Sequence, residues 1–307
     1  MTKTLFSEAC MQVLANKKLS VKYSTYTRYE RIIDKNIIPY FEGKTIDEVG
    51  IQEINDYFEL LIDIKKYSRS TIKLIKYLMN ATSEFINTQY NLSSFRKISI
   101  KIPNKQERQN ITEQQKILLS SHCFLHYDSI SFSVLIALYG GLRIGEICAL
   151  KWEYFDLDEG YTKVNKTIQR LKSKDQSVCK TNIVEDEPKT STSKRIVPLP
   201  EFLIEYIREY RIKNPADDDH YILTQSTKMV EPRTIQKRFA KLCSALGFKI
   251  NFHALRHCYA TSCVEQELDI KSVSEILGHS SVNTTLNLYV HSSFEQKRVQ
   301  VNKIKKS

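Results

Sequence analysis

The residues best suited to chemistry gather near the C-terminal end of the chain, between residues 251 and 290. This stretch contains His253, Arg256, His279 and Tyr289, which are two imidazoles, a guanidinium and a phenol. Cationic groups can neutralise the charge of a phosphodiester, and a phenol oxygen can act as a nucleophile. The combination predicts attack on a phosphodiester whose charge is held by the protein.

The spacing of these residues predicts the elements that position them. His253 and Arg256 lie three apart in FHALRHCYAT, a run without Gly or Pro, so a helix would place them on one face. Gly278 follows an apolar-periodic run and predicts a helix C-cap, with His279 immediately after it. Tyr289 comes ten residues later, on a segment predicted to form a further turn or helix.

A further arginine lies in the stretch ALYGGLRIGEICALKW. Gly140 and Gly141 predict the end of one helix, and Arg143 then falls in the first turn of the next. Glu146 lies three residues on, so it is predicted to pair with Arg143 and orient its guanidinium. An ordinary surface arginine is the alternative, but the apolar neighbours favour a buried and oriented side chain.

Residues 155–199 differ from the rest of the chain in their pattern. Strand-like segments cover residues 161–171, 182–190 and 195–199. They predict a small antiparallel sheet within an otherwise helical domain. Its turns carry three lysines that could reach a neighbouring site, and their spacing leaves the choice open: Lys180, Lys189 and Lys194.

The first 92 residues have helical periodicity throughout and predict a bundle of about four helices. Basic residues are interleaved with Tyr and Ser and could contact phosphates, although a solvated helix face explains them equally well. The candidates for DNA binding are Lys17, Lys18, Lys65, Lys66, Arg69, Lys73 and, in the next segment, Lys101.

Domain boundaries follow from where the periodicity breaks. Residues 98–111 are basic and contain Pro103, which predicts an interdomain linker, and Thr112 with Gln115 predicts a capping box that starts a new helix. The expected organisation is therefore a helical DNA-binding domain, a linker, a catalytic domain and a C-terminal tail, over residues 1–97, 98–111, 112–290 and 291–307. The fold class is mainly α with a small antiparallel β-sheet.

Composition narrows the class of partner and the compartment. A formal net charge of +11 favours an anionic partner such as nucleic acid. Seven cysteines without a Cys-x-x-Cys pair argue against a disulfide framework or zinc knuckle and for a reducing cytosol. No signal peptide or membrane-spanning run is recognisable. His253 and His257 have the spacing of a zinc pair but lack a Glu base, and no phosphate-binding loop is present, so we expect no metal or cofactor.

Several blocks of the chain resemble the tyrosine recombinases, the family of phage and conjugative-transposon integrases. The blocks are GLRIGEICALKW, EPKTSTSKRIVPL, HALRHCYAT and LGHSSVNTTLNLYVH, and together they cover most of residues 113–291. The helical N-terminal part resembles the core-binding domain of this family by pattern only. The resemblance implies cleavage and rejoining of double-stranded DNA.

The resemblance also implies a role for each matching residue. Tyr289 would attack the scissile phosphate and leave a 3′-phosphotyrosyl link and a free 5′-hydroxyl. Arg143 and Arg256 would grip the nonbridging oxygens, His279 would donate another hydrogen bond, and His253 would assist proton transfer.

Three more residues take supporting parts by the same resemblance. Lys189, in the Pro-Lys-Thr turn, would be the general acid that protonates the departing 5′-oxygen, although the hairpin is longer than in the shortest members. Glu146 would support Arg143, and His257 would be structural.

Partners and alternatives follow from the family. We expect a tetramer on DNA with the tail exchanged between protomers, possible accessory DNA-bending or excision proteins, and a mobile element integrated or excised in a prokaryotic cytosol. One alternative is a type IB topoisomerase, and another is a non-catalytic DNA-binding regulator. The separate N-terminal domain and the LGHSS block favour the recombinase, and Tyr289 in place of a Phe argues against the regulator.

Overall fold

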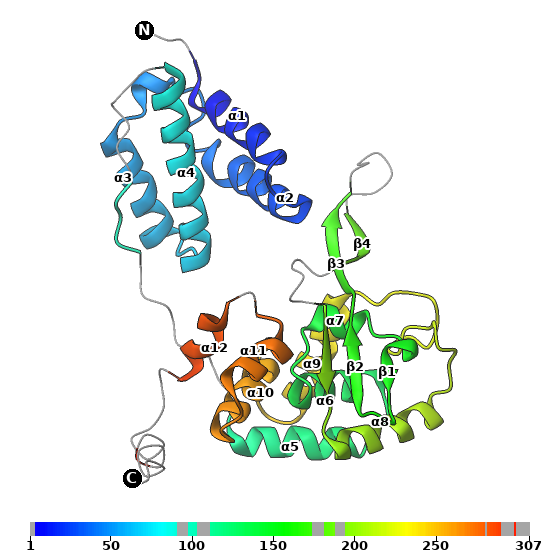
Figure 1. Ribbon diagram of the computed structural model, residues 1–307. Coiled ribbons are helices and arrows are strands. Elements are labelled where there is room, and N and C mark those ends of the chain that lie inside the picture. Colours follow the sequence, from blue (N-terminus) through cyan, green and yellow to red (C-terminus); the bar gives the residue numbers. More distant parts are fainter. Residues whose placement is uncertain are drawn as a thin grey trace, which may run out of the picture. The chain divides into compact units, whose positions relative to one another are not determined.

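The computed structural model describes residues 4–90, 98–102, 111–173, 181–187, 194–279, 281–289 and 298. The chain divides into two compact units, Met1–Glu107 and Arg108–Ser307 (Figure 1). The fold is mainly helical with small antiparallel sheets, so the predicted fold class is confirmed. No helix among the described residues is long and apolar enough to cross a membrane.

The first unit is helical, as its periodicity predicts. Its α-helices are α1 (Phe6–Lys18), α2 (Tyr23–Ile32), α3 (Ile51–Glu59) and α4 (Arg69–Tyr90). Short π-helical turns extend α2 over Ile33–Ile37 and α3 over Leu60–Ile64, and a 3-10 turn spans Ile46–Glu48. The core is rich in fully buried rings, including Phe6, Phe41 and Tyr57. Ile98 also packs on this core, and its backbone N–H donates to Asn80 Oδ1 at 2.9 Å.

The second unit is built around one buried helix. Its α-helices are α5 (Glu113–Phe124), α6 (Ser129–Tyr139), α7 (Ile144–Cys148), α8 (Glu201–Lys213), α9 (Pro232–Ala245), α10 (His253–Glu265), α11 (Ile270–Leu277) and α12 (Val282–Tyr289). Helix α6 is buried along almost its whole length and contacts α5, α7, α8, α9 and α10. The predicted capping box is present before α5, because Thr112 Oγ1 accepts from the Gln115 N–H at 3.2 Å and the Thr112 N–H donates to Gln115 Oε1 at 3.1 Å.

The described strands form two antiparallel sheets, where the sequence predicts one. The first has the order β1 (Phe155–Asp156), β2 (Tyr161–Val164), β5 (Arg195–Pro198), and the second pairs β3 (Thr167–Lys172) with β4 (Thr181–Asp186). Strand β2 pairs with β5, whereas β3 turns away to pair with β4 (Figure 1). Alternation over residues 161–171 does not reveal this division, because a period of two continues through a change of partner.

Candidate active site

Arg143 caps the start of α7, directly after a turn that requires glycine. Gly141 has φ of +69°, and a Cβ there would collide with the ring of Tyr259. The Arg143 backbone N–H donates to Glu146 Oε2 at 2.8 Å, and its Nη1 donates to Oε1 at 2.8 Å. The predicted Arg143–Glu146 pair is therefore present, and the buried Glu146 holds both ends of Arg143.

A second arginine, which the sequence reasoning did not single out, completes this pair. Arg195 begins β5, and its side chain is 5% exposed. Its Nη1 and Nη2 donate to Glu146 Oε1 and Oε2 at 3.1 and 2.9 Å. Burial tends to raise the pKa of the Glu146 carboxyl, but Arg195 and Arg143 outweigh burial and hold that pKa below its usual range. The signal that could have identified Arg195 is its place in the block EPKTSTSKRIVPL, one residue after the candidate Lys194.

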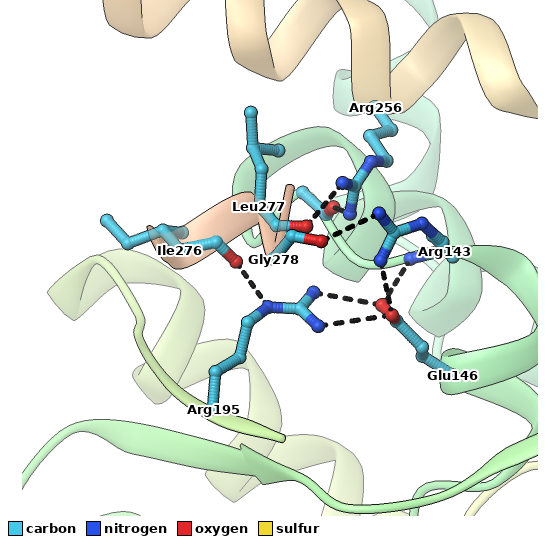
Figure 2. Close-up of polar contacts among 8 residues, drawn as sticks. Arg143, Glu146, Arg195, Arg256, Ile276, Leu277 and Gly278 are labelled. Atoms are coloured by element: carbon cyan, nitrogen blue, oxygen red, sulfur yellow. Dashed lines mark hydrogen bonds and ion pairs between the residues drawn. The ribbon is translucent and has the colours of Figure 1, made fainter. Parts of the chain in front are cut away.

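The C-terminus of α11 is contacted by guanidinium groups from three different elements. Figure 2 shows that three consecutive carbonyl oxygens each accept a hydrogen bond from a different arginine. The pairs are Ile276 with Arg195 Nε, Leu277 with Arg256 Nη2 at 2.5 Å, and Gly278 with Arg143 Nη2 at 3.0 Å. The last carbonyls of a helix lack partners within the helix and carry its partial negative charge, so they attract cations. Gly278 has φ of +59° and forms the predicted left-handed cap.

Arg256 lies at the buried side of this cluster. It projects from α10, is 4% exposed, and also donates through Nη1 to the carbonyl of Gly141 at 2.6 Å. Burial, followed by repulsion from Arg143, lowers the pKa of Arg256 to about 9. That pKa still leaves the guanidinium charged at neutral pH. Arg256 is thus a buried cation anchored by two carbonyl oxygens.

His279 follows the glycine cap and is attached to α12. Its Nδ1 lies 2.9 Å from Oγ1 of the buried Thr285. Burial, together with Arg256 and Arg143, lowers the pKa of His279 to about 4, so the ring is neutral at pH 7. When the Thr285 hydroxyl donates to an unprotonated Nδ1, the ring proton lies on Nε2, which can then donate a hydrogen bond.

The cluster has an excess of positive charge. Three guanidinium groups (Arg143, Arg195 and Arg256) surround one carboxylate (Glu146), which leaves a formal charge of +2 while His279 is neutral. Like charges at buried or half-buried positions repel one another, and an anion bound at the site would offset that repulsion. Planar guanidinium forks match the geometry of phosphate oxygens. The arrangement is suited to bind a phosphodiester.

The two histidines of α10 lie close together. His253 is the first residue of the helix and is exposed, and its ring centroid lies 4.7 Å from that of His257 in an edge-on arrangement. The predicted His253–Arg256 helix is confirmed, but the two side chains differ in environment, because Arg256 is buried in the cluster and His253 is not.

Two predicted catalytic residues cannot be placed by their side chains. Tyr289 is the last residue of α12, a helix that contacts α10 and α11, but its side chain lies outside the described part of the structure. Lys189 and Lys180 lie outside the described residues altogether. Lys194, the remaining hairpin candidate, pairs through Nζ with Glu187 Oε2 at 2.9 Å.

Several of the candidate DNA-binding residues of the first unit lie at helix ends. Lys17 and Lys18 end α1, and the Lys17 ammonium lies 5.3 Å from the ring centroid of Tyr77. Arg69 begins α4 and is half-buried. The remaining candidates are exposed: Lys65, Lys66, Lys73 and Lys101.

One set of potential metal ligands comes together among the described residues. Asp217, Asp219 and His220 have ligand atoms within 4.8 Å of one another in the loop between α8 and α9. Both carboxylates are exposed, and exposed acidic groups commonly gather without a metal. None of these residues belongs to the arginine cluster.

Comparisons with known proteins define the class of this chain. Residues 106–296, more than half of the chain, match the phage integrase family, and residues 5–62 match the N-terminal SAM-like domain of phage integrases. A tyrosine recombinase XerC-like protein of Caldanaerobacter subterraneus is 28% identical, over 91% of this chain and 77% of the relative. Tyrosine recombinase XerA of Pyrococcus furiosus is 27% identical, over 86% of each chain.

Solved structures show the same fold. The Tn1549 transposon integrase in complex with transposon right end DNA has a TM-score of 0.78 at 20% identity, covering 96% of this chain and 99% of that one. A lambda integrase tetramer bound to a Holliday junction has a TM-score of 0.66 at 17% identity, covering 92% and 76%. The chain belongs to the phage integrase family and is a site-specific recombinase of the tyrosine class.

Proposed function

We propose that this recombinase cleaves DNA with Tyr289 and holds the scissile phosphate at the arginine cluster. The observation that supports the proposal best is the excess of guanidinium groups anchored on the C-terminus of α11. Arg143 and Arg256 would contact the nonbridging oxygens, and Nε2 of the neutral His279 would donate a further hydrogen bond. Preorganised donors of this kind stabilise the charge that develops on phosphorus in the transition state.

The proposed reaction proceeds in two balanced steps. The Tyr289 oxygen attacks phosphorus, the bond to the 5′-oxygen breaks, and a 3′-phosphotyrosyl link forms. Lys189 protonates the departing 5′-oxygen, and His253 assists proton transfer from the phenol. A 5′-hydroxyl of a second strand then attacks phosphorus and passes its proton to Lys189, the bond to the Tyr289 oxygen breaks, and Tyr289 leaves as a phenol with its proton returned through His253. Because the covalent intermediate conserves the phosphodiester, rejoining requires no external energy source.

The biological role that we propose is integration and excision of a mobile element. This chain shares its fold with the Tn1549 transposon integrase, whose structure was solved with transposon right end DNA, and with lambda integrase, whose structure was solved as a tetramer on a Holliday junction. By analogy this chain would bind double-stranded DNA as a tetramer, with residues 112–290 as the catalytic domain, residues 1–97 as a second DNA clamp and residues 98–111 linking them. The tail, residues 291–307, would be exchanged between protomers, and accessory DNA-bending or excision proteins would assist the reaction.

We further propose that the enzyme works in a reducing prokaryotic cytosol. Six of its seven cysteines are described, and each of the six is a free thiol. Five of these six are buried, which is compatible with a compartment that maintains thiols.

The decisive experiment is to trap the covalent intermediate. Wild type and Tyr289→Phe would be incubated with nicked duplexes that span the ends of the element, without Mg²⁺ or ATP, and then separated under denaturing conditions. A protein–DNA adduct with wild type only is expected. Tyr161→Phe serves as the matched control, because it removes the hydroxyl of a strand tyrosine outside the cluster and should leave the adduct unchanged.

A second assay separates recombination from the alternatives. Two duplexes that carry different labels should exchange strands when both contain the recombination site. Adducts that relax supercoils without strand exchange would favour the topoisomerase alternative. Tight binding to the same DNA without any adduct would favour a non-catalytic regulator.

A further inference from the structure

We propose that Arg195 is a positioning residue that fixes the phosphate-binding side of the active site, an inference that rests on the proposed function. Arg195 is not among the residues predicted from the sequence to act at the site. Its guanidinium donates three hydrogen bonds, two to the carboxylate oxygens of Glu146 and one to the carbonyl oxygen of Ile276. Glu146 pairs with Arg143, and Ile276 lies three residues before His279; both Arg143 and His279 are proposed phosphate contacts.

The first connection runs through Glu146 to Arg143. Glu146 Oε1 accepts from Nη1 of Arg143 at 2.8 Å and from Nη1 of Arg195 at 3.1 Å, so one oxygen joins the two arginines. Arg195 also occupies Oε2 at 2.9 Å. Because Arg195 holds the carboxylate at both oxygens, it sets the plane in which Arg143 is presented.

The second connection runs through α11 to His279. Arg195 Nε donates to the Ile276 carbonyl, two residues before the glycine cap that precedes His279. A Cβ built on Gly278 would lie only 3.0 Å from Arg195 Nη1, so the guanidinium packs against the cap itself. The position of the cap, and with it that of His279, therefore depends on Arg195.

The backbone of Arg195 is held in place by the β-sheet. Arg195 pairs with Val164 in the β2–β5 ladder, and β5 contacts α11. Arg143 and Arg256 reach the same turn from two other elements, through bonds to the carbonyls of Gly278 and Leu277. Arg195 thus connects the sheet to α7 and α11. Its loss should misplace the groups that hold the phosphate, but it should not affect protonation of the departing 5′-oxygen.

The test measures single-turnover cleavage by full-length Arg195→Lys on three nicked duplexes. The first carries the normal phosphate. The second carries a methylphosphonate, in which an uncharged methyl group replaces one nonbridging oxygen. The third carries a 5′-bridging phosphorothiolate, whose thiolate leaves without protonation by an acid. Lysine keeps the charge but cannot make the fork. We expect a loss of about tenfold to hundredfold on the normal phosphate, since a whole preorganised donor is worth about a hundredfold or more. The loss should shrink on the methylphosphonate and persist on the phosphorothiolate.

Several results would overturn the inference. Cleavage by Arg195→Lys at the wild-type rate would do so, and so would equal losses on all three duplexes, which would indicate general disruption. Recovery on the phosphorothiolate alone would place Arg195 on the leaving-group side. If wild type formed no adduct, the proposed function would fail instead, so the two failures are distinguishable.

Two controls keep the outcome independent of folding. Arg208 lies on α8 and pairs with the exposed Asp158, so Arg208→Ala breaks a surface ion pair and should leave all three rates unchanged. If Arg195→Lys unfolds at the assay temperature, the double variant Glu146→Gln, Arg195→Gln removes both buried charges together. It should show the same pattern over the three duplexes, and the reverse pattern would again overturn the inference.

Discussion

His279 and Thr285 are joined by a hydrogen bond of 2.9 Å between Nδ1 and Oγ1, which links the end of α11 to α12. Thr285 is buried in the helix that ends at Tyr289. One hydrogen bond therefore couples a proposed phosphate contact to the helix of the proposed nucleophile.

Replacing Thr285 by Val should lower the rate of DNA cleavage by about tenfold, because the hydroxyl orients the imidazole and selects the tautomer with its proton on Nε2. Thr285→Ser keeps the hydroxyl and should retain most of the activity. Single-turnover cleavage of a nicked duplex measures both rates. Equal activity of Thr285→Val and wild type would show that the hydrogen bond has no part in catalysis.

The depressed pKa of His279 should make stability depend on pH. The folded state lowers this pKa from 6.5 to about 4, so folding favours the neutral ring. The stabilisation present above pH 6.5 is then lost as the pH falls toward 4, because only the unfolded state gains the proton readily. Thermal melts of wild type and His279→Gln, recorded between pH 7 and pH 4.5, should show the smaller decline for the variant. Parallel declines would contradict the assignment.

Substitution of Gly278 should be destabilising for two separate reasons. Its φ of +59° is costly for any residue with a Cβ, and the added Cβ would also press on Arg195. Gly278→Ala should lower the free energy of unfolding by about 1–2 kcal/mol and reduce cleavage at temperatures where the protein is folded. Gly247 has φ of +86° with no atom within 4 Å of a built Cβ, so Gly247→Ala carries the backbone cost alone. Denaturant unfolding and single-turnover cleavage should both be impaired in Gly278→Ala. In Gly247→Ala only the free energy of unfolding should fall, and the cleavage rate should equal that of wild type.

DNA binding by the first unit should depend steeply on salt. Lys73 is exposed on α4 and is one of the proposed phosphate contacts. Lys73→Ala should reduce the slope of log affinity against log salt by about one, because one fewer counterion is released. Lys44→Ala is the control, since Lys44 is paired with Glu53 at 2.5 Å and is not a proposed contact. Identical slopes for Lys73→Ala and wild type would remove Lys73 from the interface.

Short-range sequence patterns predicted the local elements and part of the site. Helix periodicity, the capping box at Thr112 and the glycine cap at Gly278 depend on residues a few positions apart, and the structure contains all of them. The Arg143–Glu146 pair was also predictable from short range, although Arg143 lies at the N-cap of α7 and Glu146 reaches back to it from the third helical position. The resemblance of four blocks identified the family, while the catalytic roles of all the site residues, including Lys189 and Tyr289, remain predictions.

The way the cations meet depends on how distant elements pack together. Arg195 and Glu146 are 49 residues apart, and no periodic pattern predicts that a strand residue will reach a helix cap. Likewise, the three consecutive carbonyls of α11 receive arginines from α7, β5 and α10, an arrangement set by how these elements pack. The division of the strands into two sheets was equally hidden, because alternation reports which face a residue occupies and not which strand lies beside it. Local hydrogen bonding is encoded by neighbours in sequence, whereas buried ion pairs between distant residues form only when packing excludes water from both partners.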